Sequence, residues 1–325
     1  MAAVNKYLDE IETILEYYHI PPHYLAERSV YLAPLQKPAF VLKPLKVGAA
    51  RAYLTGKLLA QQESCPIIPG LIRPDSGGYY LWRAGNRYLV TEKLPGRVAD
   101  YYSDADLKAA VIAMAIFHRF GRGLLDFEPG QWSMLEFNPG AEWRGRLREM
   151  EICREIALHF PDDPFSRQYL RCWRRLYELA FRSIWGLSRR NITEPKTICY
   201  HDWAFHNVII DQGQARLIDF DDMIVDHPVH DRANLISRYL RLYQWSTKAL
   251  FQVLWKFDQY YHWKKGELKL LGLYLTFPYE YWMLGRQYYI EKQPWSRSYF
   301  QEQWHRKIGF YKERLKVLKL IDAIE

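Results

Sequence analysis

Residues 200–222 read YHDWAFHNVIIDQGQARLIDFDD, and this stretch decides the fold. Asp202 and Asn207 lie on a predicted loop between strands, and Asp219 follows the next predicted hairpin. Mg²⁺ prefers hard oxygen ligands and is usually held by one or two carboxylates plus substrate phosphates. A further carboxylate can accept the proton of an attacking hydroxyl. We therefore expect Asn207 and Asp219 to bind the metal of a magnesium–nucleotide site, and Asp202 to be the catalytic residue that orients the hydroxyl.

Two other interpretations of this region stay open. Asp and Asn favour turns, so the three residues are alternatively loop-capping side chains without a catalytic role. Four histidines, at positions 201, 206, 227 and 230, alternate with aspartates at 221, 222, 226 and 231, which alternatively suggests a transition-metal site. We favour helix-cap and loop hydrogen bonds by His227 and Asp231 as the simpler explanation of that pattern.

Short apolar strands and long helical patterns surround this stretch. Gln212 and Gly213 predict a tight hairpin turn between two of the strands. Strands are predicted at 197–200, 208–211 and 215–218, and helices at 105–120, through 143–185 with loops between, and from 232 to the end.

The N-terminal part of the chain mixes strands and helices. Two prolines at positions 21 and 22 end an opening amphipathic helix, and residues 36–38 predict a turn. Residues 84–86, Ala-Gly-Asn, form a loop of the size that hairpins use. Helices are predicted at 7–18 and 49–62, and strands at 30–35, 39–42, 79–83 and 87–94.

The predicted fold class is α+β with two lobes. We expect a small N-terminal lobe with an antiparallel sheet, residues 1–93, and a larger, mostly helical C-terminal lobe, residues 94–325.

Composition excludes several protein classes. The 325 residues are 49% hydrophobic and 25% charged, which excludes disordered and collagen-like chains. The cysteines at 65, 153, 172 and 199 are too far apart for a zinc ribbon or a disulfide framework, so we expect free thiols in a reducing compartment. Acidic residues interrupt the N-terminal apolar positions, and no run approaches the roughly 18 apolar residues of a membrane span. We expect a soluble, cytosolic protein that contacts no membrane.

The chain is basic and rich in aromatic residues. It has 45 Lys and Arg against 37 Asp and Glu, a net charge of +8, which fits either an anionic partner or a plain solvated surface. No nucleic-acid motif accompanies the charge, so nucleic-acid binding ranks last. The 12 Trp, 25 Tyr and 15 Phe either fill the core or serve partner contacts.

The loop of residues 200–207 and the loop that begins at Asp219 resemble the catalytic loop and the metal loop of the protein-kinase and aminoglycoside-phosphotransferase superfamily. In that superfamily a His-x-Asp loop is followed, five residues after the Asp, by Asn, and a metal loop begins with Asp-Phe. Four segments further resemble the spore coat protein S family within it: CYHDWAFHN at 199–207, IDFDDMIVDHPVHDRANLI at 218–236, AIFHRFG at 115–121 and LTFPYEYWMLGRQYY at 275–289.

The resemblance implies roles for further residues and implies ATP and Mg²⁺ as cofactors. Lys43, at the end of the apolar strand PAFVLK, matches the lysine that binds the α and β phosphates. Thr91, Glu92 and Lys93 match the hinge, where main-chain groups contact adenine. Asp231 matches a buried aspartate that braces the catalytic loop.

The sequence departs from the superfamily pattern at three places. Tyr200 stands where the phosphotransferase pattern has His, and the first hairpin, SVYLAPLQKPAFVLK, contains no glycine. The helix expected at 49–62 has no acidic residue to pair with Lys43, and Glu63 follows only at its end. Either a phosphate or a rearranged partner then neutralises Lys43, or its ammonium reaches water.

Two functions follow from this pattern. The first is an ATP- and Mg²⁺-dependent phosphotransferase acting on a hydroxyl acceptor, either a coat-protein side chain or a small metabolite. The second is a catalytically inactive, kinase-like structural component of the spore coat that contacts other coat proteins. The family resemblance implies a location in the mother-cell cytoplasm and then on the spore coat.

Overall fold

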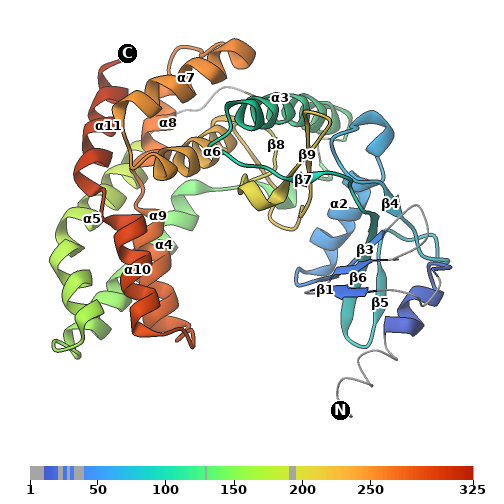
Figure 1. Cartoon of the computed structure of the whole chain (residues 1–325), viewed down its shortest axis with the longest axis horizontal. Helices are drawn as coiled ribbons and strands as arrows, with labels where there is room; N and C mark the ends of the chain where they lie inside the picture. Colours follow the sequence, from blue (N-terminus) through green and yellow to red (C-terminus); the bar gives the residue numbers. More distant parts are fainter. Residues whose placement is uncertain are drawn as a thin grey trace. The chain divides into compact units, whose positions relative to one another are not determined.

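The computed structural model of the chain describes residues 11–20, 25–27, 30–32, 40–128, 130–189 and 195–324, with the backbone alone at 25–27 and 30–32. The chain separates into two compact units (Figure 1). The first unit comprises Met1–Leu135 and Thr197–Val225, and the second comprises Glu136–Lys196 and Asp226–Glu325. The predicted lobe boundary after residue 93 falls inside the first unit and stays a prediction.

The first unit contains the described strands and two long helices. Its strands are β1 (Leu25–Glu27), β2 (Val30–Leu32), β3 (Phe40–Leu45), β4 (Leu71–Ile72), β5 (Leu81–Arg83), β6 (Asn86–Glu92), β7 (Arg97–Val98), β8 (Thr197–Cys199), β9 (Val208–Asp211), β10 (Gln214–Leu217) and β11 (Ile224–Asp226), whose last residue belongs to the second unit. Its α-helices are α2 (Ala49–Leu59) and α3 (Asp104–Phe127), and short 3-10 turns occur at Gln62–Ser64, Ser133–Leu135 and Phe205–Asn207.

An antiparallel sheet carries the expected lysine strand. β6 is central in this sheet and pairs with β3, β4 and β5. Alternate residues of β3, such as Phe40 and Leu42, point into a core that also contains Ile14 and Leu15 from the helical residues 11–16. Lys43 therefore faces away from that core. The predicted opening helix is confirmed only over 11–16, because residues 7–10 and the predicted turn at 36–38 lie outside the described residues.

Two hairpins close with the two-residue turns that suit twisted strands. Ala84 and Gly85 both have positive φ, and Asn86 pairs with Arg83, so the loop is one residue shorter than predicted. The predicted turn at residues 212–213 is confirmed, again with positive φ at both positions. This second hairpin, β9–β10, follows the catalytic loop directly.

β7 joins the hairpin sheet through a close backbone approach. It pairs antiparallel with β9, and Ala99 donates its N–H to the carbonyl of Val208. Gly96 has φ of +114°, and a Cβ there would lie 2.3 Å from the carbonyl oxygen of Ile210. Only glycine fits this position without moving the backbone of β9.

Helix α3 packs against β8, which leads into the loop of Asp202 and Asn207, and against β10. Ser103 caps its N-terminus by accepting the N–H of Asp106, and acidic residues fill the first turn, where the helix dipole favours them. The helix is longer than the predicted 105–120. Gly121, just past the predicted end, lies inside the helix, and its missing side chain permits close contact with Ile198 on β8.

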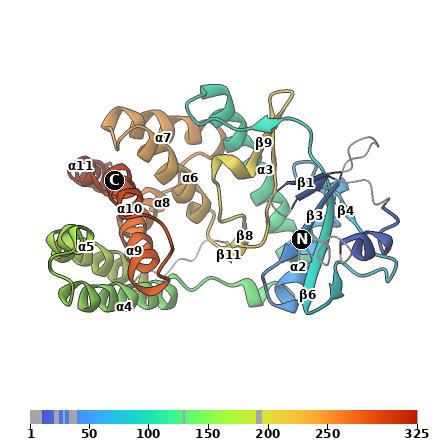
Figure 2. The ribbon, with the colours of Figure 1, turned by 60° about the horizontal axis from the view of Figure 1, so that its bottom comes forward.

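The second unit is helical. Its helices are α4 (Pro139–Leu158), α5 (Pro164–Ser188), α6 (Val229–Leu242), α7 (Thr247–Tyr261), α8 (Glu267–Thr276), α9 (Tyr279–Gly285), α10 (Arg297–Ile308) and α11 (Tyr311–Ala323), with a π-helical turn at Arg286–Ile290. α4 and α5 lie side by side (Figures 1 and 2). Asn138 and Asp163 cap these two helices, and a proline follows each cap at the first helical position.

Several further expectations from the sequence are tested by the structure. The four cysteines are free, as predicted. In the described part of the chain no helix combines the length and apolar character that crossing a membrane requires. Phe277, at the end of α8, and Tyr281 and Trp282, in α9, are buried in the core.

Candidate active site

Asp202 and Asn207 lie together in the loop that joins β8 to β9. The amide of Asn207 donates from Nδ2 to the Asp202 carboxylate (2.9 Å) and to its main-chain carbonyl (3.3 Å). Asn207 is buried at the end of the 3-10 turn Phe205–Asn207, and its main-chain carbonyl accepts the N–H of Ile218. This hydrogen bond connects the loop of Asp202 and Asn207 to Ile218, the residue just before Asp219. The spacing predicted from the sequence does bring these residues together.

Asp219 and Lys43 meet, although they are 176 residues apart in the chain. The Lys43 ammonium lies 2.5 Å from a carboxylate oxygen of Asp219 and 2.8 Å from one of Asp221. The Lys43 side chain is 30% exposed and that of Asp221 18%. Burial by itself would lower the pKa of Lys43, but the charges of Asp221 and Asp219 outweigh it, so the pKa is raised and the lysine stays cationic.

This pairing resolves the question of how Lys43 is neutralised. α2 ends at Leu59, and Glu63 lies beyond it in a separate, exposed 3-10 turn. The rearranged partner is the metal loop itself, through Asp219 and Asp221. Sequence reasoning did not assign Asp221 to the site, although its carboxylate lies only two positions after the predicted metal ligand.

Arg51 links α2 to the metal loop. Its Nη1 donates to the main-chain carbonyls of Asp221 (3.1 Å) and Met223 (2.7 Å). An arginine thus occupies the helix in which the superfamily pattern has a carboxylate, and it holds the loop backbone rather than Lys43. The signal available in the sequence was a basic residue in the first turn of that helix.

Several carboxylates converge at the metal loop. Burial raises the pKa of Asp222, and the negative charges of Asp202, Asp219 and Asp221 raise it further. A site that concentrates carboxylate oxygens in this way fits a hard divalent cation, which would relieve their mutual repulsion. Since Asn207 uses its amide nitrogen toward Asp202, its amide oxygen is left as a metal ligand. The predicted donors Asn207 and Asp219 therefore fit Mg²⁺.

The backbone of both loops is in an uncommon conformation. His201 and Asp219 have φ of 73° and 67°, a left-handed region that residues other than glycine rarely adopt. Tyr200, which replaces the superfamily histidine, is fully buried and donates its hydroxyl to the carbonyl of Ile218. Its ring contacts Phe220 edge-on, 5.2 Å between centroids. Tyr200 thus braces the metal loop at the residues on either side of Asp219.

The predicted hinge residues lie at the end of β6. Thr91 is buried and paired with β3 and β4. The N–H of Glu92 donates to Gly70, and its carboxylate accepts from Arg216 (2.9 Å). Lys93 is exposed just beyond the strand. Adenine contact by these three residues stays a prediction, and the glycine-free turn before Lys43 lies outside the described residues.

The histidine-rich segment forms ordinary hydrogen bonds. His227 accepts the N–H of Val229 at the start of α6, and the ring of His230 lies 2.6 Å from the carboxylate of Asp226. The first contact confirms the predicted helix-terminal role of His227. Asp231 is fully buried in the first turn of α6, in the second unit, and its bracing role stays a prediction.

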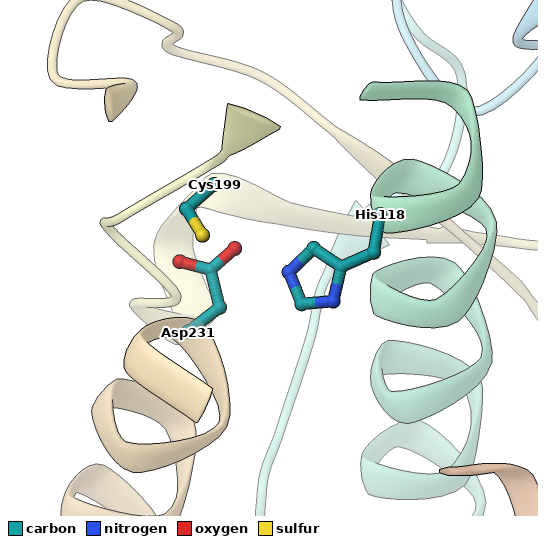
Figure 3. Close-up of side chains that lie close together, drawn as sticks. All are labelled: His118, Cys199 and Asp231. Carbon is teal, nitrogen blue, oxygen red and sulfur yellow. The ribbon is translucent and has the colours of Figure 1, made fainter. Parts of the chain in front are cut away.

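His118 and Cys199 lie close together within the first unit (Figure 3). His118 projects from α3, Cys199 ends β8, and a ring nitrogen of the one lies within 4.8 Å of the sulfur of the other. The carbonyl of His118 also accepts the hydroxyl of Thr197 (2.7 Å). These contacts fix β8, and with it the start of the catalytic loop, on α3.

Comparison of the sequence with known proteins identifies relatives over most of the chain. The model of the phosphotransferase enzyme family matches residues 39–269. Spore coat protein S of Bacillus subtilis (strain 168) is 23% identical over 252 residues, which is 73% of this chain and 70% of that protein.

Solved structures show the same fold. The aminoglycoside phosphotransferase of Alicyclobacillus acidocaldarius has a TM-score of 0.74 at 17% identity, over 96% of this chain and 95% of that one. An amicoumacin kinase in complex with AMP-PNP, Ca²⁺ and its ligand Ami has a TM-score of 0.60 at 15% identity, over 98% and 96% of the two chains. These likenesses confirm the predicted α+β, kinase-like fold class.

Proposed function

The chain belongs to the phosphotransferase enzyme family, and we propose that it transfers a phosphoryl group from Mg²⁺–ATP to the hydroxyl of an acceptor. The observation that carries this proposal is the meeting of Lys43 with the Asp219 loop, beside the hydrogen-bonded pair of Asp202 and Asn207. Phosphoryl transfer depends mainly on positioning and on stabilising charge, and these four side chains supply both. Nucleotide-analogue and divalent-cation binding by the amicoumacin kinase supports the same cofactors here.

Each residue has one task in this proposal. Asp202, oriented by the amide of Asn207, accepts the proton of the acceptor hydroxyl as the new O–P bond forms. The bond between the γ phosphorus and the oxygen bridging to the β phosphorus breaks in the same transfer, and ADP leaves. Lys43, kept cationic by its two carboxylate neighbours, binds the nucleotide phosphates. Asn207 and Asp219 hold Mg²⁺, which supplies positive charge against the phosphate oxygens when bound. Arg51 and Tyr200 keep the loop backbone around Asp219 in place.

We further propose a location on the spore coat, reached from the cytoplasm of the mother cell. The relationship to spore coat protein S supports this location. Other coat proteins are then the expected partners, and an acceptor hydroxyl lies either on one of them or on a small metabolite.

The alternative of an inactive structural coat component loses one of its two supports. Lys43 lacks a helix carboxylate but has Asp221 in its place, at 2.8 Å. The second support is the absence of glycine from the first hairpin, which bears on how closely the backbone there covers the phosphates. This support for the alternative remains.

Transfer from γ-labelled ATP to a panel of hydroxyl compounds and coat proteins tests the proposal. Asp202→Asn should reduce transfer by about 10²–10⁴-fold, because general-base catalysis is lost, while nucleotide affinity stays within about twofold. Asp211→Asn, the same change at the end of β9, is the matched control and should leave transfer unchanged. Full transfer activity in the Asp202→Asn protein would refute the assignment.

A further inference from the structure

A surface cavity of about 680 Å³ lies beside α2 in the first unit. Its lining comes from Tyr53 of α2, from Arg73 and residues 76–80, which lie between β4 and β5, and from the first two residues of β5. A cavity of this size falls in the range of small-molecule sites, roughly 300–1,000 Å³. None of these residues belongs to the proposed active site.

Aromatic side chains make up much of the cavity wall. Tyr53 and Tyr79 meet edge to face, with 5.1 Å between their ring centroids. A Cβ on Gly56 of α2 would lie 2.5 Å from the Cβ of Tyr79, so Tyr79 packs directly on the helix backbone. Trp82 is 54% exposed, and the guanidinium of Arg87 covers one face of its ring, 4.4 Å from the centroid. These contacts hold the rings in place before a ligand arrives, which lowers the entropy that binding costs.

Arg73 places a cation at the cavity. Its exposed guanidinium lies 4.8 Å from the ring centroid of Tyr79, and its Nη1 donates to the carbonyl of Gly77 (3.2 Å). These two contacts orient the guanidinium and leave most of its five N–H donors for a ligand. Arg73 forms no ion pair within the described residues, because Asp75, two positions later, pairs with His19 instead. An oriented guanidinium suits paired hydrogen bonds to carboxylate or phosphate oxygens.

Hydroxyl groups add hydrogen-bonding capacity to the same wall. The side chains of Ser76 and of the tyrosines at 53, 79 and 80 make no hydrogen bond within the part of the chain that the structure describes. Each of these hydroxyls can both donate and accept. A ligand with several hydroxyl groups can use them, whereas an aromatic acid would use only the rings and the cation.

We propose that this cavity binds a sugar that carries a carboxylate or a phosphate group. The C–H groups on one face of a pyranose ring pack on the electron-rich face of an aromatic ring, such as that of Trp82. The sugar hydroxyls form hydrogen bonds with Ser76 and the tyrosine hydroxyls, and Arg73 binds the anionic group.

The sugar site and the proposed active site lie on different sides of α2. Arg51, which holds the metal loop, precedes Tyr53 by two residues, and this spacing corresponds to about 200° around the helix axis. Tyr53 therefore projects away from the metal loop. Sugar binding at this cavity neither requires nor tests phosphoryl transfer, so the two proposals stand or fall independently.

Titration with glucuronate and with glucose, followed by ligand-observed NMR, tests the site. Glucuronate should bind about tenfold more tightly than glucose, because only the anionic sugar gains the charge-assisted contact. Arg73→Met should remove this preference. Tyr80→Phe keeps the ring and should weaken glucuronate binding by about threefold, while benzoate binding stays unchanged. A second series with glucose 6-phosphate shows which anion is preferred, because the affinity for that sugar falls further in the Arg73→Met protein.

The matched control is Arg119→Met, at an exposed position of α3, which should leave glucuronate affinity unchanged. Thermal unfolding of each variant verifies that it is folded. If Arg73→Met is unstable, Trp82→Ala, at an exposed ring, should weaken both glucuronate and glucose by about tenfold. Equal glucuronate affinity in the Arg73→Met and Arg119→Met proteins, or no binding of either anionic sugar, would overturn the proposal. Benzoate binding more tightly than glucuronate would overturn the assignment of a sugar as the ligand.

Discussion

Asp221→Asn is the substitution that most sharply separates this site from the usual kinase arrangement. The Lys43 ammonium is held between two loop carboxylates, 2.5 Å from Asp219 and 2.8 Å from Asp221. Asn at 221 keeps the size of the side chain but removes its charge. Lys43 is then left with Asp219 alone, and the Lys43 ammonium and the metal ion compete for the Asp219 carboxylate.

The magnitude follows from the exposure of the pair. Hydrogen bonds between charged groups contribute about 1.5–3 kcal/mol. The lower end applies, because Lys43 is 30% exposed and Asp219 remains as a second partner. A loss of about 1.4 kcal/mol corresponds to about tenfold, so Mg²⁺–nucleotide affinity should fall about tenfold.

Calorimetric titration with AMP-PNP, with and without Mg²⁺, measures this effect. The Asp221→Asn protein should still bind nucleotide more tightly with Mg²⁺ than without, because Asn207 and Asp219 remain. Asp219→Asn should lose that dependence on Mg²⁺. Asp211→Asn is the control and should match the unmodified protein. If Asp221→Asn binds the Mg²⁺–nucleotide within twofold of the unmodified protein, Asp221 is not the partner that positions Lys43.

Three further substitutions and one control substitution test the residues that support the site. Gly96→Ala should lower the free energy of unfolding in urea by about 2 kcal/mol, because φ is +114° and a Cβ would meet a β9 carbonyl at 2.3 Å. Gly123→Ala, in open space on α3, should raise it by about 0.5–1 kcal/mol, and equal effects of the two would contradict this reasoning. Asp106→Asn should lower Tm at pH 7, because the hydrogen bonds from Arg97 hold the pKa of Asp106 below its usual value. The Asp106 carboxylate therefore stabilises the folded state above about pH 3.8, and this stabilisation is lost as the pH falls through the lowered pKa. A Tm difference that stays constant down to pH 2 would exclude that cause. Tyr200→Phe should cost about 1–2 kcal/mol in the same urea assay, because a buried carbonyl loses its donor, and an unchanged unfolding midpoint would show that the hydrogen bond contributes nothing.

The sequence predicted the parts of the site that depend on local spacing. Asp202 and Asn207 share one loop, and a tight turn returns the chain to Asp219, so short-range patterns suffice to bring them together. Lys43 was identified by its place at the end of an apolar strand and by family resemblance. Its contact with Asp219 confirms that the two segments meet.

The roles of Asp221 and Arg51 depend on contacts between segments about 170 residues apart, which no local pattern encodes. The superfamily pattern has the carboxylate partner of this lysine on the following helix, and the sequence shows no acidic residue there. The length of α3 was underestimated for a related reason. Gly121 is a helix breaker in isolation, but its missing side chain lets α3 touch β8, and this tertiary contact outweighs the local preference.

Thermal unfolding with ATP, with and without Mg²⁺, shows whether this chain has a working Mg²⁺–nucleotide site. A ligand at a hundred times its dissociation constant stabilises the folded state by about 2.7 kcal/mol, which for a chain of 325 residues raises Tm by roughly 4 °C. We predict such a rise with ATP and Mg²⁺ together, a smaller rise with ATP alone, and only that smaller rise in the Asp219→Ala protein whether or not Mg²⁺ is added. An unchanged Tm at millimolar ATP and Mg²⁺ would contradict the account and favour the inactive coat component.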